Sequence, residues 1–356
     1  MLFLVMRLPA FIRHFTKQLG IDLGTSSTLI YECGKGLVIN ESSVVAINRR
    51  NGQVLAVGEQ ALSMVGKTPP HIFVTRPLQR GIIADFEVAE KMLRYFFDRV
   101  HAETSLVIPR PRVLISVPLE VTEVERKAVG DAALGAGARD VLLVEEPIAA
   151  AVGAGINISE PTGNMLVNIG GGSTEIAVIS LRGVVTSKSI PIAGDELNRN
   201  ITQYARDVFN LMLGERIAEE IKVAVGSAVE QPEKMEASMR GRDLLSGLPR
   251  EIIVHDGQIR EALGRSLKAI IEQIKSILEM TPPELVADIY QRGIILTGGG
   301  ALLRGLDTAI SKGTGLPVRV ADEPLTAVVR GAGLLLEQPS LLADVGFPAT
   351  EQSNMR

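Results

Sequence analysis

At residues 167–178 the sequence reads VNIGGGSTEIAV, an apolar strand that runs into three glycines, two hydroxyl residues and a second apolar strand. Glycines permit positive φ and let backbone N–H groups approach a ligand closely. The hydroxyls of Ser173 and Thr174 can add donors for phosphate oxygens. The stretch therefore predicts a β-hairpin whose turn grips a phosphate group, although an isolated glycine-rich turn is equally consistent with a tight hairpin that binds nothing.

A second copy of this pattern lies near the start of the chain. Residues 21–30 read IDLGTSSTLI, so that Asp22 stands where Asn168 does and Gly24 where Gly170 does, at a constant offset of 146 residues. Two such hairpins in two halves of a chain indicate a duplicated domain. Their turns are expected to face one ligand from opposite sides of a cleft, as in a nucleotide clamp.

The sequence resembles the actin-like ATPases, and among them the MreB family of bacterial actins. The resemblance rests on both hairpins and on further segments that follow in order from about residue 20 to about residue 336. These segments are GIIADF (81–86), VTEVER (121–126), EEPIAAA (145–151), TPPEL (281–285) and LTGGGA (296–301).

The resemblance implies an α/β, actin-like ATPase fold with two duplicated lobes around a nucleotide cleft, each with a smaller inserted subdomain. A chain of 356 residues is long enough for two such lobes. The expected division is subdomain IA at 19–46, 82–158 and 325–345, IB at 47–81, IIA at 159–195 and 258–324, and IIB at 196–257. Residues 1–18 are expected to associate with a membrane and residues 346–356 to form a flexible tail.

Composition excludes several other classes of protein. Hydrophobic residues make up 46% of the chain, but no apolar run approaches the roughly 20 residues that span a bilayer. The formal net charge of −4 and the lack of a basic stripe argue against nucleic-acid binding. The single cysteine, Cys33, excludes an intramolecular disulfide and fits a reducing cytoplasm, and the four histidines show no metal-ligand spacing.

Two apolar segments are predicted to touch a membrane surface without crossing it. Residues 1–18 combine apolar and basic side chains with no acid, but the basic residues follow the apolar run, which argues against a signal peptide. Residues 105–112 place an apolar group directly before two Pro-Arg pairs, at the position of a membrane-contacting loop in the MreB family. The predicted contacts are Phe3, Leu4, Phe11, Phe15, Leu106, Val107 and Ile108. A loose terminus and a loop that buries its own apolar residues are the alternatives.

The candidate catalytic residues are two carboxylates, Glu146 and Asp22. The apolar strand 141–144 leads to Glu146, which precedes Pro147 at the expected start of a helix. A carboxylate there can orient or deprotonate the water that attacks a γ-phosphate. The resemblance implies this water-positioning role for Glu146, whereas the alternative is that it only complements the helix dipole.

Five groups of residues are candidates for contact with the nucleotide. The third glycine turn, at 297–300, is expected to lie against the adenosine and the α-phosphate and to lead into a helix from Ala301. Glu219 and Lys222 match ribose- and base-contacting positions of the family, although their spacing also suits a surface ion pair. The full candidate set is Gly24, Thr25, Ser26, Ser27, Gly170, Gly171, Gly172, Ser173, Thr174, Gly194, Asp195, Glu219, Lys222, Gly298, Gly299, Gly300, Ala301 and Leu302.

The chain departs from its relatives at the predicted magnesium site. Actin-like ATPases usually carry an aspartate at the start of each hairpin, but the second position here is Asn168. We expect Asp22 and Asn168 to hold Mg²⁺ through its waters, with one negative charge fewer than usual. Hydrolysis is then expected to be slower than in relatives while ATP binding survives. A neutral, tolerated replacement is the alternative.

The resemblance implies a cytoskeletal ATPase that binds ATP and Mg²⁺ and polymerises into homopolymer filaments. These filaments are expected to lie peripherally on the cytoplasmic face of the membrane and to organise wall synthesis in rod-shaped cells, with membrane proteins of the elongation machinery as partners. The preference for ATP over GTP rests on the resemblance alone. A sugar or acid kinase would need a further carboxylate base, and a DnaK-type chaperone would need a peptide-binding domain after the ATPase.

Overall fold

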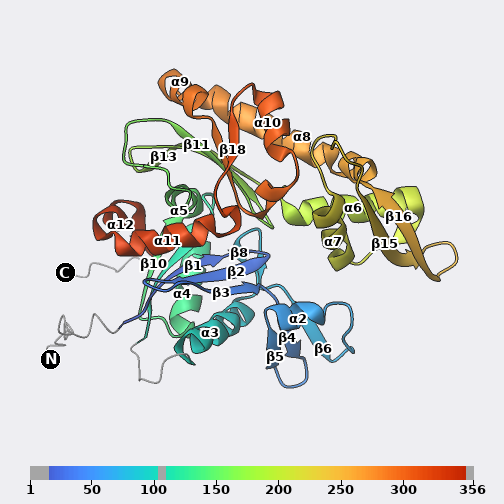
Figure 1. The fold of residues 1–356 in the computed structure, drawn as a ribbon. Coiled ribbons are helices and arrows are strands. Elements are labelled where there is room, and N and C mark those ends of the chain that lie inside the picture. Colours follow the sequence, from blue (N-terminus) through green and yellow to red (C-terminus); the bar gives the residue numbers. More distant parts are fainter. Residues whose placement is uncertain (1–15, 103–109, 350–356) are drawn as a thin grey trace.

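The computed structural model describes residues 16–102 and 110–349, which form two lobes stacked one above the other (Figure 1). Among these residues, no helix is both long and apolar enough to cross a bilayer. The seven predicted membrane-contacting residues, at positions up to 15 and at 106–108, lie outside the described part of the chain.

The first lobe is built on a six-stranded sheet with the order β19-β10-β9-β1-β2-β3. β1, β2 and β3 form an antiparallel meander, and β9 and β10 run parallel to β1. Val113 to Val117 of β9 are all buried, as expected for a parallel strand covered on both faces. The strands are β1 (Gln18–Leu23), β2 (Ser27–Glu32), β3 (Gly36–Ser42), β9 (Arg112–Val117), β10 (Asp140–Glu145) and β19 (Gly346–Pro348).

The second lobe repeats this topology in five strands, without a counterpart of β19. Its sheet has the order β13-β12-β11-β17-β18, with an antiparallel meander of β11, β12 and β13 and with β17 and β18 parallel to β11 and to each other. This order corresponds to β3-β2-β1-β9-β10 of the first lobe, which confirms the duplicated α/β fold. The strands are β11 (Asn164–Ile169), β12 (Thr174–Ser180), β13 (Gly183–Ile190), β17 (Ile294–Thr297) and β18 (Val318–Val320).

Helices form three layers around the two sheets (Figure 1). α3 (Phe86–Ala102) and α4 (Glu123–Ala136) cover the outer face of the first sheet. α5 (Glu146–Gly153) and α11 (Ala327–Glu337) lie between the sheets and share one apolar core with both. The outer face of the second sheet packs against α6 (Gly194–Phe209), α8 (Asp256–Met280) and α10 (Leu306–Thr314).

The two central helices approach each other closely because glycines face each other at their crossing. A Cβ added at Gly153 would lie 1.7 Å from the carbonyl oxygen of Ala327, and one added at Gly331 would lie 1.7 Å from that of Ala149. No side chain larger than hydrogen fits at either position. The crossing therefore fixes α5, which begins with Glu146, between the lobes.

Subdomain IB is a small sheet inserted after β3, with the order β5-β4-β6. It consists of β4 (Val45–Asn48), β5 (Gln53–Val57), α2 (Glu59–Ser63) and β6 (Ile72–Thr75), around a core of Val44, Ala46 and Ala61. The short hairpin of β7 (Leu78–Gln79) and β8 (Ile82–Ile83) returns the chain to the first lobe.

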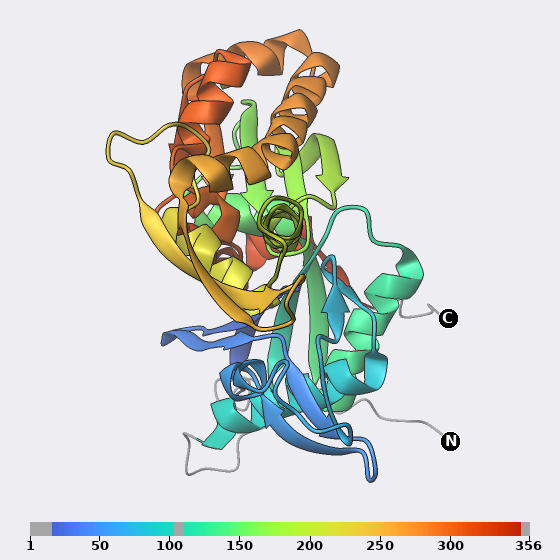
Figure 2. The ribbon, with the colours of Figure 1, turned by 90° about the vertical axis from the view of Figure 1, so that its right-hand side faces the viewer.

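Subdomain IIB is inserted in the second lobe and contains a second small sheet, with the order β14-β15-β16. Its elements after α6 are β14 (Leu211–Met212), α7 (Glu215–Val225), β15 (Glu236–Asp243) and β16 (Pro249–His255). In Figure 2 the blue strands of subdomain IB lie below the yellow and orange strands β15 and β16, so the two insertions share one side of the molecule.

The structure corrects three sequence-based expectations about boundaries. Gln18 belongs to β1 and not to the predicted N-terminal segment. The predicted tail begins too early, because Gly346–Pro348 forms β19 on β10, and Ala349 fills the space left by Gly130. Ala301 lies in the 3-10 turn η1 (Gly299–Leu302), and the next α-helix starts at Leu306. The remaining elements are α9 (Pro283–Arg292), η2 (Pro324–Thr326) and α12 (Pro339–Val345).

Candidate nucleotide site

The two predicted hairpins form the same turn. The N–H of Gly24 donates to the carbonyl of Ser27 at 3.1 Å, and the N–H of Gly170 donates to that of Ser173 at 3.0 Å. Each turn lies at the end of the first strand of its lobe, β1 or β11, where the parallel strands of that sheet also end. The duplicated sequence therefore gives duplicated turns at equivalent edges of the two sheets.

The tips of the two turns meet. A Cβ added at Gly171 would lie 2.0 Å from Ser26 Oγ, and one added at Gly172 would lie 2.6 Å from Thr25 Oγ1. Glycine is favoured at both positions because of this close approach. The side-chain oxygen of Thr25 accepts a hydrogen bond from the N–H of Gly81 at 2.7 Å, which ties the first turn to the β7–β8 hairpin.

Thr174 has a different role from the one predicted. Its side chain is fully buried, and its hydroxyl donates to the carbonyl of Ile192 at 2.6 Å. The matching residue of the first hairpin, Thr28, is also fully buried and bonds to Ser43. Both hydroxyls therefore stabilise the base of their hairpins, and the expectation that Thr174 offers a donor to phosphate is not met in this structure.

Asp22, Glu146 and Asn168 gather beneath the turns. Asn168 Nδ2 donates to Glu146 Oε1 at 2.6 Å, and Asn168 Oδ1 accepts from the hydroxyl of Thr297 at 3.0 Å. Burial raises the pKa of Glu146 to about 7, although the bond from Asn168 opposes this shift. The pKa of Asp22 is raised well above its usual value by burial and then by the charge of Glu146.

These residues fit a magnesium ion that arrives with a nucleotide. In the described part of the chain, no cluster of three or more His, Cys, Asp or Glu residues forms a metal site. Mg²⁺ is commonly held by one or two carboxylates, water and substrate phosphates, so Asp22 alone can supply the protein's charge. Asn168 Oδ1 keeps one lone pair free after its bond to Thr297, which a metal-bound water can use.

The third glycine turn packs against the base of the second hairpin. Gly298 has a φ of +79°, and an added Cβ there would lie 2.4 Å from the carbonyl oxygen of Ile169. Its N–H donates to the carbonyl of Pro324 at 2.8 Å. Ala301 is buried in the core of the second lobe, whereas Leu302 is 54% exposed. Gly298 thus lies next to Asn168 and Gly300 next to Ile169, whereas the side chain of Ala301 is buried in the core of its own lobe.

Helices α6 and α7 complete the side of the site in the second lobe. The N–H groups of Gly194 and Asp195 donate to the carbonyls of Gly170 and Gly171, at 3.1 and 2.8 Å. Lys222 Nζ binds the carbonyl of Gly194 at 3.3 Å and Glu219 Oε2 at 2.7 Å. The ion pair that the spacing of Glu219 and Lys222 suggests is therefore present, and Lys222 links it to Gly194, which bonds to the second hairpin.

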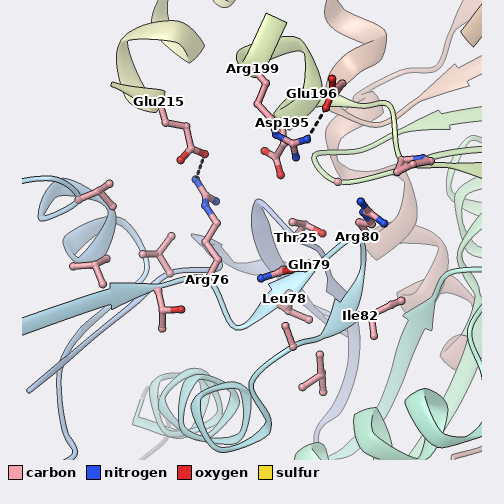
Figure 3. A pocket seen from close by; sticks show the side chains of 18 residues that line it. Thr25, Arg76, Leu78, Gln79, Arg80, Ile82, Asp195, Glu196, Arg199 and Glu215 are labelled. Carbon is pink, nitrogen blue, oxygen red and sulfur yellow. Dashed lines mark hydrogen bonds and ion pairs between the residues drawn. The ribbon is translucent and has the colours of Figure 1, made fainter. Parts of the chain in front are cut away.

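A cavity of about 630 Å³ opens between subdomains IB and IIB and is lined by Thr25 and Gly172 from the two turns (Figure 3). Arg76, from the first lobe, reaches across it to Glu215 on α7, with Arg76 Nη2 and Glu215 Oε1 3.2 Å apart. Arg80 and Asp195 also line this cavity. The sequence did not reveal the Arg76–Glu215 pair, because its members are 139 residues apart.

A buried carboxylate that the sequence analysis missed is Glu175, on β12. Its side chain is fully buried, and its Oε1 accepts from the N–H of Leu119 at 3.0 Å. Burial, followed by the charge of Glu146, raises the pKa of Glu175 well above its usual value. A signal was present in the sequence, because an acidic residue inside an otherwise apolar strand is rarely buried without a specific reason.

Two lobes of matching topology, with paired glycine turns over a cluster of buried carboxylates, define an actin-like protein. Solved structures agree: MreB5 of Spiroplasma citri bound to AMPPNP matches with a TM-score of 0.87 and 37% identity, over 91% of this chain and 97% of that one. A MamK double helical filament matches in fold with a TM-score of 0.76. The chain belongs to the MreB/Mbl protein family, whose model matches residues 16–344.

Curated relatives of this family cover nearly the whole chain. The cell shape-determining protein MreB of Escherichia coli (strain K12) is 50% identical over 334 residues, or 93% of this chain and 96% of that protein. The cell shape-determining protein Mbl of Bacillus subtilis (strain 168) is 48% identical over 323 residues, or 91% of this chain and 96% of that protein. These matches confirm the predicted family and do not favour the kinase and chaperone alternatives.

Proposed function

We propose that this protein is an ATP-binding, filament-forming cytoskeletal ATPase that determines cell shape. One observation carries the proposal: two matched glycine turns meet tip to tip above Asp22, Glu146 and Asn168. Backbone N–H groups in such turns suit the oxygens of a triphosphate, and a carboxylate beneath them suits the orientation of water. The MreB5 structures bound to AMPPNP and to ADP support ATP as the ligand of this chain.

Hydrolysis is proposed to use Glu146 to orient the attacking water, and Asp22 and Asn168 would hold Mg²⁺ through its waters. The position of Glu146, at the first residue of α5 and in contact with Asn168, supports this role. When bound, Mg²⁺ neutralises charge on the β- and γ-phosphates. Because Asn168 contributes no charge, hydrolysis is proposed to be slower than in relatives that carry aspartate there.

Self-association is supported by exposed apolar side chains at two ends of the second lobe. In the turn between β15 and β16, Leu245 is 82% and Leu248 is 65% exposed. At the other end, Met280, the last residue of α8, is 58% exposed and Tyr290 of α9 is 67% exposed. In Figure 1 these regions lie at opposite ends of that lobe. A head-to-tail filament brings such ends together without closing a ring.

Sedimentation with Mg²⁺ and ATP tests this proposal directly. The wild type is expected to pellet with ATP and to remain in the supernatant without nucleotide, because phosphates hold the lobes in one arrangement. Leu245→Asp should abolish pelleting while leaving ATP binding intact. Val124→Asp is the matched control, since Val124 is 79% exposed on α4 of the first lobe. A wild type that stays monomeric with ATP at high concentration on lipid would refute the assembly proposal.

Peripheral binding to the cytoplasmic membrane is proposed through residues 1–15 and through Leu106, Val107 and Ile108. Two weak apolar insertions per subunit become strong when a filament repeats them. Flotation with liposomes of anionic lipid should weaken when either segment is made polar and should vanish when both are. Unchanged flotation of the double variant would contradict this part of the proposal.

A role in cell shape is proposed from the names of the relatives, which are cell shape-determining proteins. The proposed partners are further copies of the chain and membrane proteins of the elongation machinery. Filaments on the inner face of the membrane can organise wall synthesis by holding these partners in place. Loss of the protein should convert rod-shaped cells to round ones, and the assembly-deficient Leu245→Asp variant should not restore the rod shape.

A further inference from the structure

Glu175 stands directly opposite Asn168 in the antiparallel pair of β11 and β12. Residues opposite each other in such a pair project to the same face of the sheet, so the two side chains are neighbours. The amide of Asn168 in turn donates to Glu146 at 2.6 Å. Asn168 therefore lies between Glu175 and Glu146, the candidate catalytic carboxylate.

The carboxylate of Glu175 also connects the two lobes. Its Oε1 accepts from the N–H of Leu119, which lies in the loop between β9 and α4 of the first lobe. We call residues 118–122 the β9–α4 loop. A second bond holds the same loop: Glu120 Oε1 accepts from the N–H of Ser189 on β13 at 3.3 Å. The loop of the first lobe is thus fixed to two strands of the second.

The β9–α4 loop is connected to the first hairpin through Gly81 of the β7–β8 turn. A Cβ added at Gly81 would lie 2.5 Å from Pro118 Cγ, so the β7–β8 turn packs on the start of the loop. The N–H of Gly81 donates to Thr25 in the first turn. Val117, the last residue of β9 before the loop, lies opposite Glu145 of β10, the residue before Glu146. Contacts therefore lead from both glycine turns to Glu146 by way of this loop.

The second oxygen of Glu175 is unused. Glu175 Oε2 is buried and has no hydrogen-bond partner among the described residues. A buried polar atom without a partner is unfavourable unless a water or a ligand satisfies it. Because Glu175 neighbours Asn168, a water bound to this oxygen lies at the edge of the candidate nucleotide site.

We propose that Glu175 is a positioning residue for hydrolysis: Oε1 fixes the β9–α4 loop to the second lobe, and Oε2 holds a water beside Glu146. This inference rests on the proposed ATPase function. Closure of the lobes around a nucleotide and placement of the attacking water are then coupled, because one carboxylate takes part in both. A shift of the loop that breaks the bond to Leu119 also moves the water.

Phosphate release at saturating Mg²⁺ and ATP, measured together with ATP affinity, tests this role. Glu175→Ala should lower the release rate by about tenfold or more, because misplaced reacting groups are costly, while ATP affinity changes by less than about twofold. Glu175→Gln should restore most of the rate, since its amide oxygen can accept from Leu119 and its NH₂ can bind water. If Glu175 only stabilised the fold, its replacement would not lower the rate of phosphate release while leaving ATP affinity unchanged.

Glu120→Ala is the matched control, because it removes the other bond of the same loop at an exposed site. It should leave the release rate within about twofold of the wild type. The inference is overturned if Glu120→Ala lowers the rate as much as Glu175→Ala does, if Glu175→Gln is no better than Glu175→Ala, or if Glu175→Ala is fully active. Should Glu175→Ala fail to fold, Leu119→Pro removes the donor instead, and a wild-type rate in that variant would equally overturn it.

Hydrogen exchange at the amide of Leu119 tests the link between the lobes without relying on ATP hydrolysis. It therefore distinguishes a failure of this inference from a failure of the proposed ATPase function. With AMPPNP bound, the amide should exchange slowly in the wild type and in Glu175→Gln, and at least about tenfold faster in Glu175→Ala. If the wild type released no phosphate at all, the ATPase proposal would be wrong and the positioning role would be wrong with it. Exchange at Leu119 would then still decide whether Glu175 links the lobes, and equal exchange in all three proteins would exclude the link.

Discussion

Asn168 Nδ2 lies 2.6 Å from Glu146 Oε1 and donates a hydrogen bond to it across the interface of the two lobes. Asn168 is the next-to-last residue of the second-lobe strand β11, before the glycine turn, whereas Glu146 starts α5 after the first-lobe strand β10. An aspartate at 168 would place two carboxylates at this distance. The amide therefore holds Glu146 in place without the repulsion that a second charge would bring.

Asn168→Asp should raise the rate of phosphate release at saturating Mg²⁺ by about tenfold if the placement of the metal limits hydrolysis. The introduced carboxylate supplies a second charge near the cation, as in most actin-like ATPases. Without Mg²⁺ the same variant should be less stable than the wild type, because the new charge faces Glu146 and Asp22. Equal rates in both proteins would show that Glu146 and lobe closure, and not the second carboxylate, set the chemistry.

The pair of Arg76 and Glu215 should control how fast nucleotide leaves the cleft. The two side chains are 29% and 51% exposed, so the pair contributes only about 0.2–1 kcal/mol to stability. Arg76→Gln should release a fluorescent ATP analogue about two- to fivefold faster at low salt, and the difference should shrink at high salt. Arg216→Gln is the control, since Arg216 pairs with Glu220 on the surface of α7 alone. Identical release from both variants would contradict a role in closing the cleft.

The crossing of α5 and α11 should not tolerate a methyl group. Gly331→Ala should lower the free energy of unfolding by about 3 kcal/mol or more, because its Cβ would overlap the carbonyl oxygen of Ala149. Gly264→Ala is the control: Gly264 lies inside α8 with open space around it, so alanine should stabilise the protein by about 0.5–1 kcal/mol. Urea unfolding measures both changes, and a Gly331→Ala variant as stable as the wild type would refute the packing described for these helices.

The nucleotide-free protein should lose stability as the pH rises from about 4.5 to 7. Glu146 has a pKa of about 7 in the folded state against 4.5 for an ordinary glutamate, so the folded state binds its proton more tightly than the unfolded state does. Stability from this group is therefore present at low pH and is lost as the pH rises through 7; Asp22 and Glu175 act in the same direction. Thermal melting of Glu146→Gln should depend less on pH in this window. A melting temperature of the wild type that rises with pH would contradict the shift.

The duplicated fold and the glycine turns could be predicted because their requirements are local. Gly24 and Gly170 mark equivalent turns, and a constant offset in sequence reveals the repeat. The start of α4 is local in the same sense: Thr122 and Glu125, three residues apart in the sequence, form a capping box there. Backbone geometry of this kind depends on a few neighbouring residues.

Features that depend on distant pairing could not be predicted. β19 forms because Gly346–Pro348 finds β10 some two hundred residues earlier in the chain, and nothing in those three residues marks them as a strand. The contact of Glu175 between the lobes could not be predicted, because its partner, the N–H of Leu119, lies in the other lobe. Thr174 matches a phosphate-binding pattern in sequence, but the carbonyl of Ile192 takes its hydroxyl. Tertiary partners decide each of these cases.

Phosphate release from Mg²⁺ and ATP by Glu146→Gln, at ATP concentrations that saturate the site, tests the central claim most directly. If the two glycine turns hold ATP and Glu146 orients the attacking water, ATP affinity should be retained while the release rate falls by about 10²-fold or more. A Glu146→Gln variant that binds ATP and releases phosphate as fast as the wild type would contradict the account of this site.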